Sequence, residues 1–330
     1  MANLTLSKRL KHIFWEPRYP NVGIEFASDS IRMVVVSVEQ GRIALQQFDS
    51  EEVPTGAVEI NPFKPNILKL DVMAEALKSL WFRNRFKSSK VCLLLQDRCA
   101  LTFHVALEHP AGNRDECLDL IRFKLRKGIP FRMEEAQISY FDASGAVDHS
   151  SAALWVTIIH QGVLRQYEQL VQSAIETECG LVDLSTFNLL NLGDWEVRSR
   201  GFQDQDLLYV NLNQDYLSVA ITQKGKLSFY RSRALEKQNG VIEEALAEIY
   251  PATMYYVDKL GGQTLARALV YSAENSEELC SAIQKALQLK AVLLTPESLA
   301  GTSFDPSTLR YLRTFAPLVG LVVSRKVEFI

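Results

Sequence analysis

The sequence carries the same β-rich pattern twice, roughly 190 residues apart, and this repeat limits the possible folds more than any other feature. The first copy begins near Val22 and the second near Leu208. In each copy, stretches rich in β-branched residues alternate with turn-forming Gly, Asn, Asp and Ser, which predicts three strands joined by tight turns. A repeat at this distance indicates an internal duplication. We therefore expect two related domains, each opening with three strands.

The rest of the chain alternates predicted helices with short buried strands. The helical period is clear in residues 71–81, where Val72, Ala76, Leu77 and Leu80 are expected on one buried face. This mixed order of strands and helices behind β-rich openings predicts an α/β fold. Further helices are predicted at 115–127, 162–177, 241–260 and 276–289, and further strands at 91–95, 154–159 and 180–183.

The composition is that of a globular protein with room for about two domains. The chain has 330 residues, of which 47% are hydrophobic and 23% are charged. A formal net charge of −3 gives no electrostatic signature of nucleic-acid binding. The five cysteines form no CxxC pair, which is typical of reduced thiols rather than of disulfides or a zinc site. No apolar stretch approaches the ~20 residues of a membrane span and no signal peptide is evident, so we expect a cytoplasmic protein.

No catalytic motif occurs in the sequence. P-loop, GxGxxG, GxSxG and HExxH patterns are all missing. His104 and His109 are five residues apart, a poor spacing for metal ligands on a helix or a strand. We therefore predict no catalytic residue and no metal site.

Residues 1–21 form a basic leader that stands apart from the predicted domains. Its cations Lys8, Arg9 and Lys11 are interleaved with Leu, Ile, Phe and Trp. One interpretation is a short amphipathic helix whose cations contact anionic lipid at a membrane surface. The alternative is a poorly ordered leader held by one or two aromatic residues.

Five segments match one known protein family in the family's own order. Residues 23–32 (GIEFASDSIR) are similar to an opening written GIDIGSSSIK, and the predicted helix at 115–126 followed by GIPFRMEE (128–135) is similar to a helix ending in YIPFPLEE. Residues 180–187 are similar to a G-L-x-P-x-x-V-D-x-E-x-F region, and residues 315–321 to a closing AxALGLALR. The family they resemble is PilM of type IV pili, which belongs to the superfamily of actin, hexokinase and Hsp70.

The resemblance implies an actin-like α/β fold, in which two duplicated RNase H-like domains face a cleft and a small βα subdomain is inserted in the first domain. The expected division is a leader at 1–21, the first part of domain 1 at 22–90, the inserted subdomain at approximately 91–180, a return to domain 1 with a crossover helix at 181–206, domain 2 at 207–310, and a C-terminal helix returning to domain 1 at 311–330.

The phosphate loops depart from the family pattern. The first loop has Glu25 where the family has the Asp that orders Mg²⁺, and Ala27 before Ser28 where it has the Gly that lets backbone N–H groups close around phosphate. In the second loop, Asn211 stands for the Asp and Asn213 for the Gly. Asn211 lacks the charge, and Asn213 puts a side chain where phosphate would lie.

The adenosine-contacting SGG turn of the family corresponds to Ser272 and Ala273 followed by Glu274, which adds a carboxylate near the nucleotide. Each change has a milder interpretation, because Ala fits where φ is negative, Asn accepts left-handed backbone and Glu can carry magnesium. Taken together, the changes predict a pseudo-ATPase that needs no cofactor, with weak binding of ATP and Mg²⁺ as the alternative.

The resemblance implies a non-catalytic cytoplasmic scaffold of a type IV pilus or related secretion machine. Such a protein grips the cytoplasmic N-terminal tail of a PilN-like inner-membrane protein, and is held at the inner face of that membrane by this partner. We expect Ile129 and Phe131 to lie near the groove for this tail, or else to pack in the core of the inserted subdomain. The alternatives are an active ATP-binding PilM-like ATPase, an FtsA-like membrane-tethered protein that self-associates into polymers, and a sugar or acetate kinase of the superfamily.

Overall fold

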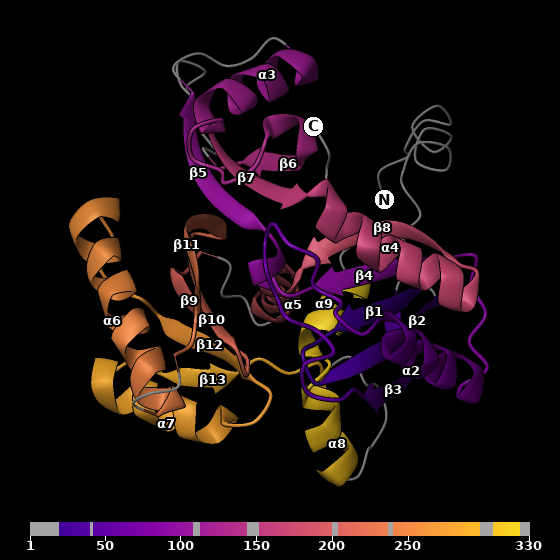
Figure 1. Cartoon of the computed structure of the whole chain (residues 1–330). Coiled ribbons are helices and arrows are strands. Elements are labelled where there is room, and N and C mark those ends of the chain that lie inside the picture. Colours follow the sequence, from indigo (N-terminus) through magenta and orange to yellow (C-terminus); the bar gives the residue numbers. More distant parts are fainter. Residues whose placement is uncertain are drawn as a thin grey trace, which may run out of the picture.

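Figure 1 shows the computed structural model, in which two five-stranded sheets with their helices lie side by side and a smaller three-stranded sheet projects from them. The structure describes residues 20–39, 42–107, 113–143, 152–199, 204–236, 240–297 and 306–323.

The first five-stranded sheet has the order β3-β2-β1-β4-β8. An antiparallel meander of β1, β2 and β3 is followed by parallel pairing of β4 with β1 and of β8 with β4. One face packs on helices α2 and α4, and the other on α5 and α9. The strands are β1 (Val22–Phe26), β2 (Ser30–Glu39), β3 (Arg42–Glu52), β4 (Lys90–Leu95) and β8 (Glu178–Leu184), and the helices are α2 (Leu70–Arg83), α4 (Gln161–Ile175), α5 (Ser185–Ser199) and α9 (Ala316–Val323).

The second sheet repeats this topology, with the order β11-β10-β9-β12-β13. Its first three strands again form an antiparallel meander, and β12 and β13 add in parallel. The predicted duplication is therefore confirmed, and so is the α/β fold class. The elements are β9 (Leu207–Leu212), β10 (Tyr216–Gln223), β11 (Lys226–Ala234), α6 (Val241–Leu260), β12 (Arg267–Ser272), α7 (Ser276–Leu287) and β13 (Ala291–Leu293).

The small sheet has the order β5-β7-β6 and is covered on one face by α3. It occupies residues 101–160, a narrower span than the expected subdomain at 91–180, because β4, α4 and β8 at the ends of that range pack in the first domain. Its elements are β5 (Leu101–Leu107), α3 (Arg114–Leu125), the 3-10 turn η2 (Met133–Glu135), β6 (Ala136–Asp142) and β7 (Ala152–His160).

The buried face of helix α2 differs from the prediction at its first residue. In α2 the buried side chains are those of Met73, Ala76, Leu77, Leu80 and Trp81, whereas Val72 is exposed. Met73 supplies the first contact of the i, i+3, i+4, i+7 stripe, so Val72 falls just outside the buried arc. Among the helices of the described segments, none is long and apolar enough to cross a membrane.

The last segment that the structure describes packs on the first domain. After α8 (Pro306–Arg313), helix α9 crosses α5 and lies over β1. At Gly320 the two helices approach so closely that a Cβ atom would stand 2.0 Å from the backbone oxygen of Asn188. At Gly23 of β1 a Cβ atom would stand 2.9 Å from Cδ1 of Leu318. Glycine at these two positions therefore lets α9 reach the sheet.

We predict that Gly320→Ala destabilises the fold by about 1–3 kcal/mol, because the added methyl group meets backbone that must shift. In an uncrowded helix the same change would stabilise by up to about 1 kcal/mol. Urea unfolding measures the difference, with Gly128→Ala as control, since the nearest atom to a Cβ there is 3.6 Å away. Equal stability of Gly320→Ala and wild type would contradict the close crossing of α5 and α9.

Candidate functional site

The phosphate-loop positions lie where the two large domains meet. The turn between β1 and β2 faces the loop between β9 and β10, and Gln214 of the second loop reaches Asp29 of the first. The 3-10 turn η1 (Asp97–Cys99), which follows β4, and the first residues of α5 lie against β9 and β10. Most of the polar side chains at this junction bond to one another.

Glu25 on β1 is paired within its own domain. It is 3% exposed and stands directly opposite Arg32 of β2, whose Nη1 lies 3.3 Å from Glu25 Oε2. The Nη2 atom of Arg32 also lies 3.6 Å from Asp29 Oδ1. Burial raises the pKa of the Glu25 carboxyl and the charge of Arg32 lowers it in part. The acid predicted at the magnesium position is thus already bound to a guanidinium group.

Ala27 and Ser28 form a closed turn. The Ala27 N–H donates to the carbonyl oxygen of Ser30 at 2.9 Å, so this amide is already occupied. Ala27 is buried and its φ is not positive, so the methyl group causes no backbone strain. Ser28 is half-buried beside it. The substitution of Gly by Ala is therefore well accommodated here.

Asp97 joins the two domains and was not found by sequence reasoning. It is 1% exposed, and its carboxylate accepts hydrogen bonds from Thr186 N (2.9 Å), from the Thr186 hydroxyl, from Ser218 Oγ (2.6 Å) and from Asn211 Nδ2 (3.4 Å). Thr186 belongs to α5 of the first domain, whereas Ser218 and Asn211 belong to the second. Burial raises the pKa of Asp97, and these hydrogen bonds lower it in part.

Asn211 and Asn213 complete the same network. Asn211 is buried, and its Nδ2 also lies 3.1 Å from Ser185 Oγ and 2.9 Å from Thr186 Oγ1. Its Oδ1 accepts from Asn213 Nδ2 at 2.7 Å. Asn211 therefore uses its amide to hold the two domains together, and Asn213 bonds to that amide from within the second domain.

Gln214 bridges the cleft itself. Its Nε2 donates to Asp29 Oδ2 at 2.9 Å and to Glu274 Oε1 at 2.7 Å. The first contact crosses from the second domain to the first, and the second contact reaches the turn after β12. Gln214 of the second predicted phosphate loop is thus bonded directly to Asp29 of the first.

A cavity of about 240 Å³ remains on the second domain, next to this bridge. It is smaller than the ~300–1,000 Å³ of common small-molecule sites. Three predicted positions, Asn213, Ser272 and Ala273, line it together, beside Glu274. Its other lining residues are Leu212, Gln214, Val241 and Asn275.

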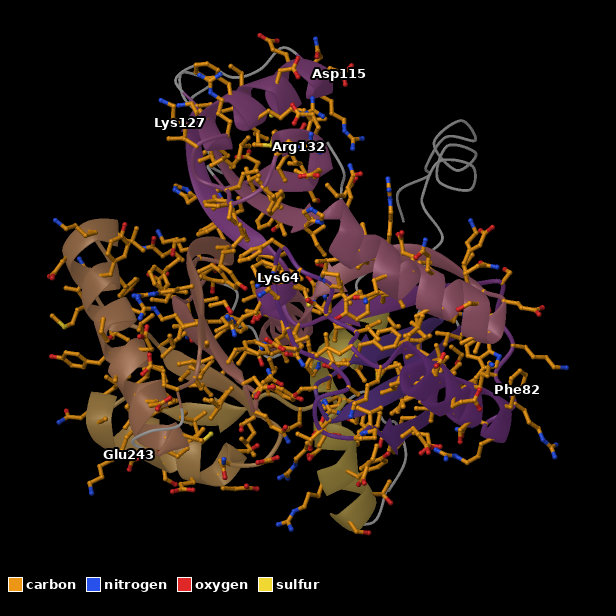
Figure 2. All side chains as sticks on the ribbon, in the orientation of Figure 1. Lys64, Phe82, Asp115, Lys127, Arg132 and Glu243 are labelled. Carbon is orange, nitrogen blue, oxygen red and sulfur yellow. The ribbon has the colours of Figure 1, made fainter. Side chains whose placement is uncertain are left out.

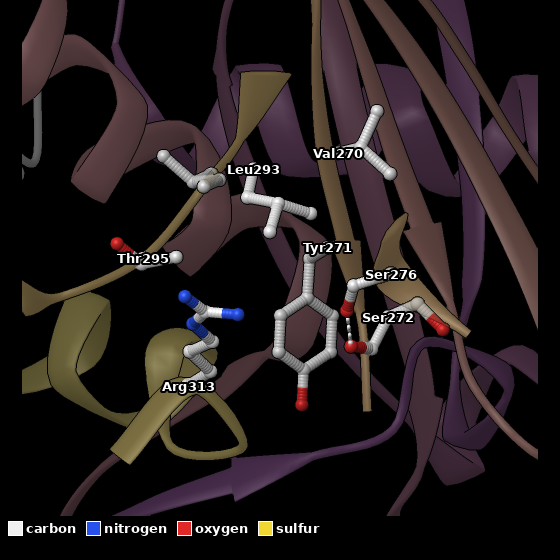
Figure 3. A pocket seen from close by; sticks show the side chains of 8 residues that line it. Val270, Tyr271, Ser272, Ser276, Leu293, Thr295 and Arg313 are labelled. Carbon is white, nitrogen blue, oxygen red and sulfur yellow. Dashed lines mark hydrogen bonds between the residues drawn. The ribbon is translucent and has the colours of Figure 1, made fainter. Parts of the chain in front are cut away.

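A second, smaller hollow lies behind Ser272. Figure 3 shows the side chains that line it, among them Tyr271, Arg313 and the hydrogen-bonded pair of Ser272 and Ser276. Its volume is about 10 Å³, room for about one water molecule. Arg313 bonds to Glu277 and Glu297, each at 2.9 Å, so its charge is balanced by its neighbours.

The remaining predicted positions that the structure describes lie away from the cleft. Ile129 is 9% exposed in the core of the small subdomain, and Phe131 is half-buried with its ring edge-on to His160 at 4.9 Å. His104 packs against the Trp155 ring at 5.0 Å. The leader cations Lys8, Arg9 and Lys11, and also His109, lie outside the described residues.

The residues that sequence reasoning missed are Asp97, Thr186, Ser218, Gln214 and Arg32. One signal was available for Asp97, because it comes two residues after the end of the buried strand β4. In α/β sheets, ligands bind beyond the carboxyl ends of the parallel strands, so a polar residue at that place is a candidate site residue. The others are ordinary polar residues in strands and turns, with no local pattern to mark them.

We predict that Asp97→Asn destabilises the protein by about 2–4 kcal/mol. The carboxylate only accepts hydrogen bonds, whereas an amide would turn donor hydrogens toward the donors of Thr186 and Ser218, leaving buried groups unpaired. Thermal and urea unfolding measure the loss, with the exposed Asp119→Asn as control for the same chemical change. A variant as stable as wild type would show that the network is not required for domain closure.

Comparison with solved structures identifies proteins of similar architecture. No protein-family model and no curated protein matches the amino-acid sequence. The structure is similar to a PilM-PilN type IV pilus biogenesis complex, with a TM-score of 0.76 and 16% identity over 94% of this chain and 99% of that one. It is also similar to a Bacteroides thetaiotaomicron protein with actin-like ATPase fold and unknown function, with a TM-score of 0.52 and 11% identity over 96% of this chain and 99% of that one. The chain therefore has the actin-like ATPase fold, in a form similar to that of PilM.

Proposed function

We propose that the chain is a non-catalytic scaffold of a type IV pilus or related secretion machine. The observation that carries the proposal is that the groups a nucleotide would need are bonded to other protein groups. Glu25 is paired with Arg32, the Ala27 amide is closed on Ser30, and Gln214 spans the cleft to Asp29. No cofactor is part of the proposed function.

Energetics support this proposal. Binding ATP with Mg²⁺ would require an acid free to order the metal ion, and here that acid would first have to leave a buried guanidinium. Breaking a buried ion pair costs about 3–5 kcal/mol, which is as large as the whole binding free energy of a weak, millimolar ligand, about 4 kcal/mol. The Gln214 bridge adds two hydrogen bonds to carboxylates, each worth about 1.5–3 kcal/mol.

One observation favours a second candidate, a protein that still binds nucleotide. The cavity of about 240 Å³ is lined by Ser272 and Ala273, the turn that the sequence resemblance assigns to adenosine contact. It is bordered by Glu274, whose carboxylate would repel phosphate. A nucleotide could use this cavity only if the Gln214 bridge opened.

We propose that the partner is the cytoplasmic N-terminal tail of a PilN-like membrane protein, on the strength of the likeness to the PilM-PilN complex. The small subdomain offers an edge for it, because β6 pairs with β7 on one side and ends the sheet on the other. An extended tail can bind such an edge by adding a strand, with Phe131 and Phe141 beside it. The tail would hold the scaffold at the cytoplasmic face of the inner membrane.

We predict that ATP with Mg²⁺ binds with a dissociation constant weaker than about 100 μM, because of the bonds that must be broken. Calorimetry at tens of micromolar protein measures it. Gln214→Ala should tighten binding, whereas Gln223→Ala at the other end of the second sheet should leave it unchanged. Submicromolar affinity in wild type, or steady hydrolysis that Glu25→Ala abolishes, would contradict the pseudo-ATPase.

We predict that a synthetic tail of the neighbouring membrane protein binds with micromolar affinity, since ordering a short peptide costs about 2–5 kcal/mol. Phe131→Ala should weaken binding by about tenfold while keeping most of the stability. Ile129→Ala should lower stability first, because Ile129 is in the core. Phe123→Ala on the far side of α3 is the matched control. Failure of the tail to bind at high micromolar concentration would remove the main support for the scaffold.

A further inference from the structure

The small subdomain carries a basic segment in a protein that is acidic overall. From Leu120 to Met133 the chain contains five Arg and Lys residues and no Asp or Glu, whereas the whole chain has a formal net charge of −3. The five cations are Arg122, Lys124, Arg126, Lys127 and Arg132, and all five are exposed.

Three of these cations have no acidic partner among the residues that the structure describes. Arg122 pairs with Asp119 and Arg132 with Glu135, each at 2.9 Å. Within the described part of the chain, no carboxylate lies within ion-pair distance of Lys124, Arg126 or Lys127. Their charge therefore faces solvent at the C-terminal end of α3.

An exposed aromatic ring lies among these basic side chains. Phe123 is 64% exposed, and the guanidinium carbon of Arg126 lies 4.7 Å from the centre of its ring. We call Arg122, Phe123, Lys124, Arg126 and Lys127 the tip patch. Basic residues at the end of a helix complement its dipole, and this accounts for part of the charge but not for a large apolar ring left in water.

The tip patch also protrudes. Figure 1 shows α3 at the outer end of the small subdomain, away from both five-stranded sheets. In Figure 2, Asp115 lies in the first turn of this helix and Lys127 just beyond its last residue. The first turn carries acids and the last turn carries bases. A projecting end can meet a flat surface without contact from the rest of the molecule.

We infer that the tip patch binds the surface of a membrane that contains anionic lipid. Lys124, Arg126 and Lys127 would contact lipid phosphates, and Phe123 would enter the boundary between headgroups and acyl chains. Nucleic acid fits less well, because Arg126 already covers the Phe123 ring on which a base would stack. This inference does not depend on tail binding and would stand if the tail did not bind.

Vesicle sedimentation with the full chain tests the inference. Vesicles of phosphatidylcholine with about 30% phosphatidylglycerol are compared with phosphatidylcholine alone, at about 0.05 M and about 0.5 M salt. We expect binding to the anionic vesicles alone, and its loss at high salt. Each cation near such a surface contributes about fivefold, so Lys124→Gln, Arg126→Gln and Lys127→Gln together should weaken binding by about a hundredfold. Phe123→Ser should weaken it by about tenfold.

Matched controls test whether vesicle binding depends on the tip patch itself or on exposed cations and rings anywhere on the protein. The triple change Lys64→Gln, Lys69→Gln and Lys87→Gln removes three exposed cations from the first domain, and Phe82→Ser removes a ring that is 66% exposed. Both controls should leave vesicle binding within about twofold. A further triple change, Lys8→Gln, Arg9→Gln and Lys11→Gln, measures how much the leader contributes to vesicle binding.

Three results would overturn the inference. The first is vesicle binding that the tip-patch changes leave intact, and the second is binding that disappears with the leader change alone. The third is binding of the tip patch to a single-stranded oligonucleotide and not to anionic vesicles. Circular dichroism and unfolding of each variant show whether the fold is kept. The substituted side chains of the tip patch and of the first domain are exposed, so these changes should alter stability by less than about 0.5 kcal/mol.

Discussion

The buried carboxylate of Asp97 is the interaction on which the arrangement of the two domains depends. It accepts hydrogen bonds from the backbone and hydroxyl of Thr186 on one side of the cleft, and from Ser218 and Asn211 on the other. Removing a carboxylate from water is costly, and only several well-placed donors offset that cost. Because the donors come from both domains, the carboxylate is satisfied only when the domains are closed. Closure is thus the state in which this buried charge is stable.

Closing the cleft in this way uses the positions that the sequence resemblance assigns to the two phosphate loops. An Asp in place of Asn211 would bury a second negative charge beside Asp97, whereas the amide donates to it. Likewise, Glu25 tolerates burial because Arg32 lies opposite it, and the Gln214 amide satisfies Asp29 and Glu274 at once. These side chains therefore satisfy one another at the cleft, and this mutual pairing is the physical basis of the proposal that the cleft serves structure rather than catalysis.

The sequence predicted what depends on local pattern and missed what depends on pairing across the chain. The openings at Val22 and Leu208 were visible because strand and turn signals alternate within a few residues. Strands β5 and β6 were missed, since their faces are half-exposed and carry no continuous apolar run. The partners of Asp97 stand about 90–120 residues away in sequence, and one chain without relatives gives no signal for such contacts. For the same reason the sequence could not tell core from groove at Ile129.

The small subdomain is tied to the closed cleft through a second set of contacts. Trp155 of β7 donates its indole N–H to the carbonyl oxygen of Leu227 at 2.9 Å, so the small sheet is bonded directly to the second domain. Phe187 at the start of α5 stacks on Tyr230 with ring centres 5.2 Å apart and meets Phe141 of β6 at 5.8 Å. Rotating the second domain away from the first would break the Trp155 bond together with the Asp97 network. The direction in which the tip patch points is therefore set by the closed state, and any ligand that opened the cleft would also change how the subdomain faces a membrane.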